Sequence, residues 1–241
     1  MEFSYDPGLV ALSIAAAILG SFTGLVMMSG IHRVRGPEAA LRFALGGMGI
    51  GGGVWSMHFI AMLAVVLPAK LTYSVPETLI SAGLAVLFTI VALWVVASQK
   101  FGPLSLPLSA LFLGSGIGTM HYLGMHAIRG CSLQYSVLSV GVAILIAIQA
   151  SGVALWFTFR MRGVLDTFLG SIALGLAIAS MHYTAMEGTR FLQAGGPLPF
   201  ANVFKEAALA VAVAITLYTI CSVCLIVFAV LTFSRPSVRR V

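Results

Sequence analysis

Long apolar runs separated by short polar stretches make up most of this sequence. A helix that spans a membrane needs about 20 consecutive, mostly apolar residues. Seven runs reach that length, and they cover about residues 9–31, 41–67, 76–98, 104–127, 136–159, 166–186 and 207–233. The pattern predicts an all-α integral membrane protein, residues 1–241, with seven transmembrane helices in a single domain.

The composition excludes a soluble enzyme. Hydrophobic residues make up 60% of the 241 residues and charged residues only 8%, whereas about a quarter of the residues in a soluble domain are charged. The net charge of +6 comes from cations at the ends of the apolar runs. The chain has no basic run with interleaved aromatic residues and no phosphate-binding loop, so we expect the lipid bilayer and not a nucleic acid as its partner.

The distribution of Lys and Arg predicts the orientation in the membrane. Glu2 and Asp6 precede the first run and Arg33 and Arg35 follow it, which is the reverse of a cleavable signal peptide. Alternate loops carry nine and four cations, and the richer side holds Arg33, Arg35, Arg42, Lys100, Arg160, Arg162, Arg235, Arg239 and Arg240. The positive-inside rule then places the N-terminus outside and the C-terminus in the cytoplasm.

Two-helix units repeat along the chain. Met-His-aromatic-x-small-Met recurs at His58, His121 and His182, which are 63 and 61 residues apart, near the end of every even-numbered run. The predicted units cover about residues 9–67, 76–127 and 136–186, and a final helix covers about 207–233. Each histidine lies about 4–8 Å beyond the middle of its helix, toward the outer face. If the even helices are neighbours, the three imidazoles meet in one layer.

Helical geometry selects the side chains that share a face with each histidine. The methionine four residues later lies about 40° around the helix from the histidine. These methionines are Met62, Met125 and Met186. The glycine seven residues earlier, Gly51, Gly114 or Gly175, lies about 20° from the same direction. Glycine at that position lets two helix backbones approach closely.

The three motifs resemble the MHYT domain, a bacterial integral-membrane sensor family named after this tetrapeptide. Met181-His182-Tyr183-Thr184 matches the name in full, whereas the first copy has Phe59 and Ile60 after its histidine. The resemblance implies a copper site made of the motif His and Met side chains, through which oxygen, carbon monoxide or nitric oxide is sensed. It also implies a location in the bacterial inner membrane and a cytoplasmic partner such as a cyclic-di-GMP synthase or phosphodiesterase. About eight residues follow the last predicted helix, so we expect a stand-alone member, a partner-dependent sensor or a fragment.

The chemistry of the ligand set favours Cu(I). Imidazole suits several transition metals, and thioether sulfur selects Cu(I). Neutral ligands leave the charge of the ion in the membrane, and the Born cost of a monovalent ion is about a quarter of that of a divalent one. Zinc and haem are the alternatives. The weaker candidate ligands are Met57, Met120, Met181, His126, Cys131 and Glu187.

These features favour a metal-dependent membrane sensor, and not an enzyme, that responds to a diatomic gas or to copper. A second hypothesis is a membrane electron-transfer protein that holds haem between helices, since His and Met are both axial haem ligands. A third hypothesis is a metal ion permease. It is weaker, because the inner halves of the even helices offer no further ligands along a route to the cytoplasm. A retinal protein is excluded because the last helix has no Lys for a Schiff base. The pattern leaves the oligomeric state open.

Overall fold

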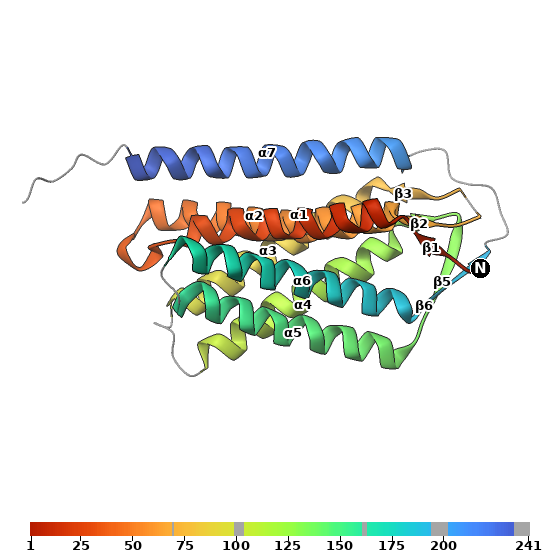
Figure 1. The fold of residues 1–241 in the computed structure, drawn as a ribbon, viewed down its shortest axis with the longest axis horizontal. Coiled ribbons are helices and arrows are strands. Elements are labelled where there is room, and N and C mark those ends of the chain that lie inside the picture. The colour runs from red at the N-terminus through yellow and green to blue at the C-terminus, as the bar shows by residue number, and fades with distance from the viewer. Residues whose placement is uncertain (69, 99–103, 161–162, 194–201, 234–241) are drawn as a thin grey trace, which may run out of the picture.

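In the part of the chain that the computed structural model describes, seven long helices lie side by side (Figure 1). The structure describes residues 1–241 except 69, 99–103, 161–162, 194–201 and 234–241. The helices are α1 (Pro7–Met28), α2 (Pro37–Leu63), α3 (Val75–Ser98), α4 (Ser105–His126), α5 (Val137–Arg160), α6 (Val164–Glu187) and α7 (Glu206–Phe233). The helical architecture is confirmed, and each helix end lies within four residues of its predicted position.

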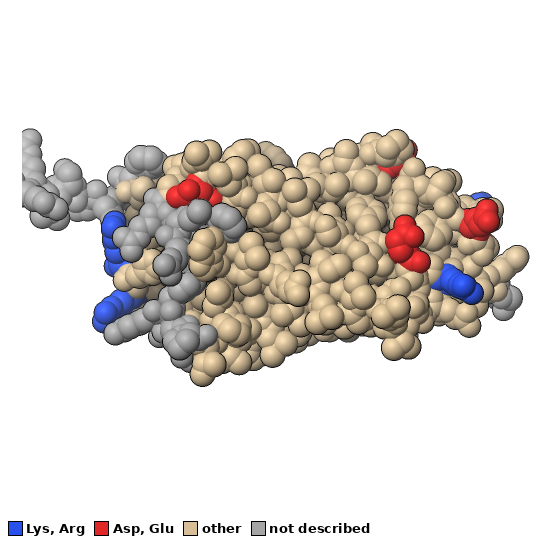
Figure 2. All heavy atoms as spheres, turned by 60° about the horizontal axis from the view of Figure 1, so that its bottom comes forward, with Lys and Arg blue, Asp and Glu red and all other residues tan. Residues whose placement is uncertain are grey.

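Five of the seven helices, α1, α3, α5, α6 and α7, are long and apolar enough to cross a membrane. In α2 and α4, Gly, Ser and His residues lower the mean hydropathy. On the face drawn in Figure 2, charged side chains lie near the two ends, and the surface between them carries none. This arrangement suits a helical domain embedded in a bilayer. The orientation stays a prediction, and Lys100, Arg162, Arg235, Arg239 and Arg240, which contributed to it, lie outside the described residues.

Helices α1 to α6 form a closed ring. Each packs against the next one in the chain, and α6 packs back against α1. The even helices α2, α4 and α6 also contact one another, so they meet at the centre of the ring. Helix α7 lies outside the ring, against α1 and α2 (Figure 1). The motif-bearing helices are therefore neighbours, which is the condition for their histidines to meet.

Short strands at one end of the bundle were not predicted from the sequence. They are β1 (Ser4–Tyr5), β2 (Val65–Val66), β3 (Thr72–Ser74), β4 (Ile128–Arg129), β5 (Cys131–Tyr135), β6 (Thr189–Gln193) and β7 (Val203–Lys205). All the pairs are antiparallel: β1 with β2, β3 with β4, β5 with β6, and β7 with β3. Each repeat is therefore a strand–helix–helix–strand unit whose two strands pair with each other.

A backbone hydrogen bond closes each unit next to its strands. The amides of Asp6, Ser74 and Ser136, just before the odd helices, donate to carbonyls just after the even helices, at 2.8, 2.8 and 2.9 Å. Asp6 also caps α1, because its carboxylate accepts from the amides of Gly8 and Leu9. These bonds fix the ends of the even helices, where the motif histidines lie.

The glycines seven residues before the motif histidines set how closely the helices pack. A Cβ atom on Gly51, Gly114 or Gly175 would lie 2.7, 2.5 or 2.9 Å from a backbone Cα of α3, α5 or α1, respectively. Backbone atoms cannot move aside as side chains do, so only glycine fits there. The close approach predicted at these glycines is present, and it joins each even helix to an odd one.

Candidate metal centre

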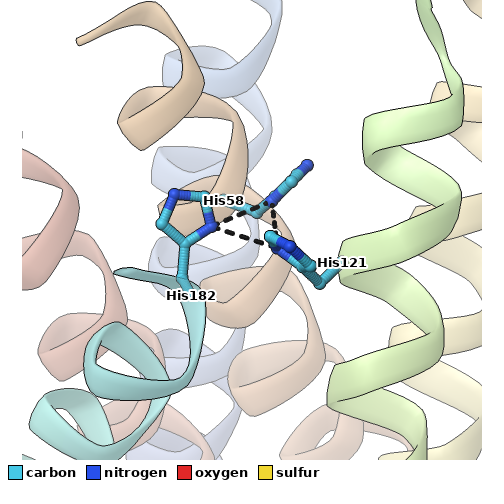
Figure 3. A group of neighbouring side chains, drawn as sticks. All are labelled: His58, His121 and His182. Carbon is cyan, nitrogen blue, oxygen red and sulfur yellow. Dashed lines mark hydrogen bonds between the residues drawn. The ribbon is translucent and has the colours of Figure 1, made fainter. Parts of the chain in front are cut away.

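The three motif histidines meet at the centre of the ring. His58, His121 and His182 come from α2, α4 and α6, and all three are fully buried. Their rings point toward one another (Figure 3), and the Nδ1 atoms are 3.2 Å apart in all three pairs. Among the described His, Cys, Asp and Glu residues, these three form a group that could hold a metal ion.

Hydrogen bonds alone cannot account for this triangle. An imidazole nitrogen carries either a hydrogen or a lone pair, so it is a donor or an acceptor but never both. Among three mutually contacting Nδ1 atoms, at least one pair must therefore bring two hydrogens or two lone pairs together. A cation at the centre removes the conflict, because it can accept all three lone pairs. The arrangement is thus suited to an ion.

The size of the triangle fits a transition-metal ion. The centre of an equilateral triangle with 3.2 Å sides lies about 1.85 Å from each corner, close to the roughly 2.0–2.1 Å of a Zn–imidazole bond. A point about 0.7 Å above the plane lies about 2.0 Å from each nitrogen. The three residues therefore fit an ion with little movement of their rings.

Among the described residues, no hydrogen bond holds the other ring nitrogens. The Nε2 atoms of all three histidines are buried and find no hydrogen-bond partner among the described residues. Metal-binding histidines usually donate their second N–H to a carboxylate or a carbonyl. Here Gly124 of α4 lies against His58, and a Cβ on Gly124 would come within 2.4 Å of the His58 Nε2 atom. At His58 a close contact, and not a hydrogen bond, thus restricts the ring orientation.

An aromatic layer covers the histidines. Each motif aromatic residue, Phe59, Tyr122 or Tyr183, meets its preceding histidine edge-to-face, with ring centroids 4.8 to 5.0 Å apart. Edge-to-face pairs contribute about 0.5–1.5 kcal/mol beyond the area they bury. These contacts restrict the rotation of the imidazole rings.

Sequence reasoning missed a second aromatic layer, which consists of Tyr5, Tyr73 and Tyr135 of β1, β3 and β5. Tyr73 packs on Phe59, Tyr135 on Tyr122 and Tyr5 on Tyr183, with centroids 6.0, 5.4 and 5.4 Å apart. The tyrosine of each unit thus contacts the motif of the preceding unit around the ring. One signal was available: each tyrosine is followed by Asp6, Ser74 or Ser136 and then by an odd helix.

The remaining candidate ligands lie in two groups. All six motif methionines, Met57, Met62, Met120, Met125, Met181 and Met186, are buried, and their role as ligands stays a prediction. His126, Cys131 and Glu187 lie outside the three-histidine group. His126 and Glu187 are exposed at helix ends, and Cys131 is half-buried in β5. Burial raises the pKa of the Cys131 thiol, which disfavours a thiolate there.

The fold and the site together define a helical membrane domain with a buried three-histidine centre. A family model described as a bacterial signalling protein N-terminal repeat, MHYT, matches residues 1–41, 51–107, 114–171 and 175–240. The chain belongs to the MHYT family. The resemblance seen in the motifs is therefore confirmed over nearly the whole chain.

The relatives are signalling proteins of greater length. The chain is 42% identical over 194 residues to the bifunctional diguanylate cyclase/cyclic di-GMP phosphodiesterase MucR of Pseudomonas aeruginosa, a match that covers 78% of this chain and 28% of MucR. It is 34% identical to the cyclic di-GMP phosphodiesterase NbdA of the same species, over 81% of this chain and 26% of NbdA. It is 29% identical to the signaling protein YkoW of Bacillus subtilis, over 79% and 25% of the two chains. The chain thus spans about a quarter of the length of these relatives, and no solved structure matches it.

Proposed function

We propose that this chain is a membrane sensor domain that binds one metal ion, copper as Cu(I), between His58, His121 and His182. The convergence of three buried Nδ1 atoms at 3.2 Å carries the proposal. Polar side chains at membrane depth are costly and tend to be functional. Three of them that meet at one point, with no hydrogen-bonding pattern to satisfy them, support an ion as their common partner.

The surroundings favour a soft, monovalent ion. The described group of potential ligands contains no carboxylate, and the centre is fully buried. Without a negative ligand the whole charge of the ion stays in the protein, and the cost of burying it rises with the square of the charge. Met62, Met125 and Met186 are buried one helical turn after the histidines, and thioether ligands select Cu(I).

The proposed output is a signal to a cyclic-di-GMP enzyme, in a partner or in the same polypeptide. The relatives that carry this domain include a diguanylate cyclase/phosphodiesterase and a cyclic di-GMP phosphodiesterase. The proposed input is a diatomic gas that binds to the ion, or the supply of copper itself. Such a ligand must favour one arrangement of the helices over another, because a ligand that binds both equally transmits nothing.

The metal is tested by elemental analysis of detergent-purified, copper-exposed protein. We expect about one copper per chain in the wild type and none in the His58/His121/His182→Ala variant. The two remaining histidines provide a matched control, and His32→Ala/His126→Ala should keep its copper. Equal copper content in the wild type and the triple variant would show that the motif histidines are not ligands of the metal.

A haem would give a different result and suits the geometry less well. A haem held by two axial histidines places its ring between them, whereas the Nδ1 atoms here are in mutual contact at 3.2 Å. An absorption spectrum distinguishes the two. A strong Soret band in the purified protein would show that the site holds haem and not copper. With Cu(I) in the site, bound carbon monoxide would give an infrared C–O band that the triple variant lacks.

A further inference from the structure

The three histidines occupy equivalent positions in the repeat, but the side chains that hold them differ. Each histidine is covered by its motif aromatic residue, and a strand tyrosine packs on that aromatic residue in turn. We call each such set, one histidine with its two covering rings, an arm. The arms of His58, His121 and His182 can be compared contact by contact, because the repeat places equivalent residues around each of them.

The His182 arm is fixed by a hydrogen bond. The Tyr183 hydroxyl lies 3.0 Å from the Ser13 Oγ of α1. Ser13 donates its own hydrogen to the Val10 carbonyl at 2.7 Å, so it accepts from Tyr183. On its other side Tyr183 packs edge-to-face on Tyr5, at 5.4 Å. Both the hydroxyl and the ring of Tyr183 are therefore held.

The His58 arm is fixed by burial. Phe59 is fully buried between Trp55 and Tyr73, at centroid distances of 5.3 and 6.0 Å. Trp55 is itself held, because its indole N–H donates to the Thr78 carbonyl at 3.0 Å. Tyr73 is only 1% exposed. No polar group on Phe59 needs a partner, so this arm is complete without a hydrogen bond.

The His121 arm has neither of these restraints. The Tyr122 hydroxyl is buried and finds no hydrogen-bond partner among the described residues. The residue equivalent to Ser13 is Ala143 here, because each lies eight residues after the strand tyrosine of its unit. Tyr135, which packs on Tyr122, is 38% exposed. A buried hydroxyl without a partner is destabilising, and an exposed ring restrains its neighbour weakly.

We propose that His121 is the releasable ligand of the centre, and that Ser13 on the His182 arm and the buried Phe59 on the His58 arm position the two permanent ligands. This proposal rests on the proposed function, since it assigns unequal roles within the same site. If His121 withdrew from a bound ion, that bond would break and the lone pair would stay on Nδ1. A small neutral donor such as carbon monoxide would supply the lone pair for the vacated position, and no charge would change.

The first experiment transfers the missing hydrogen bond into the His121 arm. Ala143→Ser places a hydroxyl at the Ser13-equivalent position, and a single hydrogen bond of ordinary strength corresponds to about a fivefold effect. We expect Ala143→Ser to slow the loss of Cu(I) to a competing chelator about fivefold. In the double variant Ala143→Ser/Tyr122→Phe the new serine has no tyrosine hydroxyl to bond to. Its rate of Cu(I) loss should therefore equal that of Tyr122→Phe alone. An unchanged rate in a folded Ala143→Ser protein would overturn the proposal.

The second experiment compares single histidine variants. We expect His121→Ala to keep one copper per chain on two ligands, and to bind it at least tenfold more tightly than His58→Ala or His182→Ala. Equal affinities of the three variants, or the weakest binding in His121→Ala, would overturn the proposal.

A metal-free readout separates this proposal from the copper site itself. In the apo protein with isotope-labelled histidine, NMR relaxation should show exchange broadening of the His121 ring and sharper signals from His58 and His182. Ala143→Ser should sharpen the His121 signal, and Ser13→Ala should broaden that of His182. A wild type that binds no copper would refute the metal site alone, whereas three equally broad or equally sharp rings would refute the unequal arms.

Discussion

Gly124 provides a direct test of the three-nitrogen centre. It lies in α4, three residues after His121, but it faces the ring of His58 from α2. A Cβ atom at this position would come within 2.4 Å of the His58 Nε2 atom, whereas ordinary contacts begin at 3.4 Å. Gly124→Ala must therefore displace the His58 ring by about 1 Å.

The displacement is large on the scale of a coordination bond. If the His58 ring retreats along the line through its two nitrogens, its Nδ1 atom moves toward the centre of the triangle. If the ring swings aside, the Nδ1 atom leaves the triangle by about 1 Å. Either shift is too large for a metal–nitrogen bond of roughly 2.0 Å to keep its length. Perturbed ligand orientation typically costs 10–100-fold in metal affinity. We expect a loss at the upper end, about 100-fold, which corresponds to about 2.8 kcal/mol. The stability should change less, because overpacking costs about 1–3 kcal/mol and replacing a helical Gly by Ala recovers about 1 kcal/mol.

The assay is competition for Cu(I) with a chelator of known affinity, combined with X-ray absorption to count nitrogen ligands. Gly47→Ala is the matched control, because its Cβ would also clash with a single residue, Ile90, whose side chain lies at 2.2 Å and whose backbone nitrogen lies at 3.2 Å. Gly47 precedes His58 by eleven residues in α2. The control should bind Cu(I) within twofold of the wild type. A folded Gly124→Ala protein with wild-type affinity and an unchanged nitrogen count would refute the assignment of His58 as a ligand.

Four further results are expected. Met125→Leu preserves the side-chain volume, so it should weaken Cu(I) binding at least tenfold while leaving Zn(II) binding within twofold; equal losses for both metals in parallel titrations would argue against a thioether ligand. Because burial raises the pKa of Cys131, its thiol stays protonated at neutral pH, and alkylation should be slow at pH 7 and accelerate beyond the range of an ordinary thiol. A membrane-impermeant maleimide added outside intact cells should label Cys131 at raised pH, and labelling only after permeabilisation would reverse the predicted orientation. Glu77→Gln removes a partly exposed ion pair with Arg129 at 2.6 Å, so the loss of stability in thermal unfolding should stay below about 1 kcal/mol, and a larger loss would mean that the pair fixes β4.

The helices and the three histidines could be predicted because each has a strong one-dimensional signal. Membrane spans follow from the length of the apolar runs, and the histidines recur at nearly equal spacing with a methionine on either side. Their convergence needed one more fact, namely that the even helices touch. The sequence contains no direct signal for that contact, because the even helices are separated by an odd helix each time.

The strands and the outer tyrosines could not be predicted in the same way. Strands of two to five residues are too short to show an alternating pattern. No sequence pattern therefore marked Tyr5, Tyr73 and Tyr135 as partners of the motif aromatic residues. Gly124 was visible only as the small residue of the motif, and its contact with His58 depends on how α2 and α4 cross. The unequal restraint of the three arms is likewise a property of side-chain pairs, such as Ser13 with Tyr183, from distant parts of the chain.

Closure of the helix ring determines how many histidines reach the centre. Gly51 and Gly114 pack against the odd helix that follows each of them in the chain, whereas Gly175 packs against α1. If the pattern had continued, Gly175 would have packed against α7. Because α1 occupies that place, three units close the ring, and α7 remains outside with β7 paired to β3. Three complete units bring three histidines together, so any change that displaces α1 from Gly175 should open the centre although it touches none of its ligands.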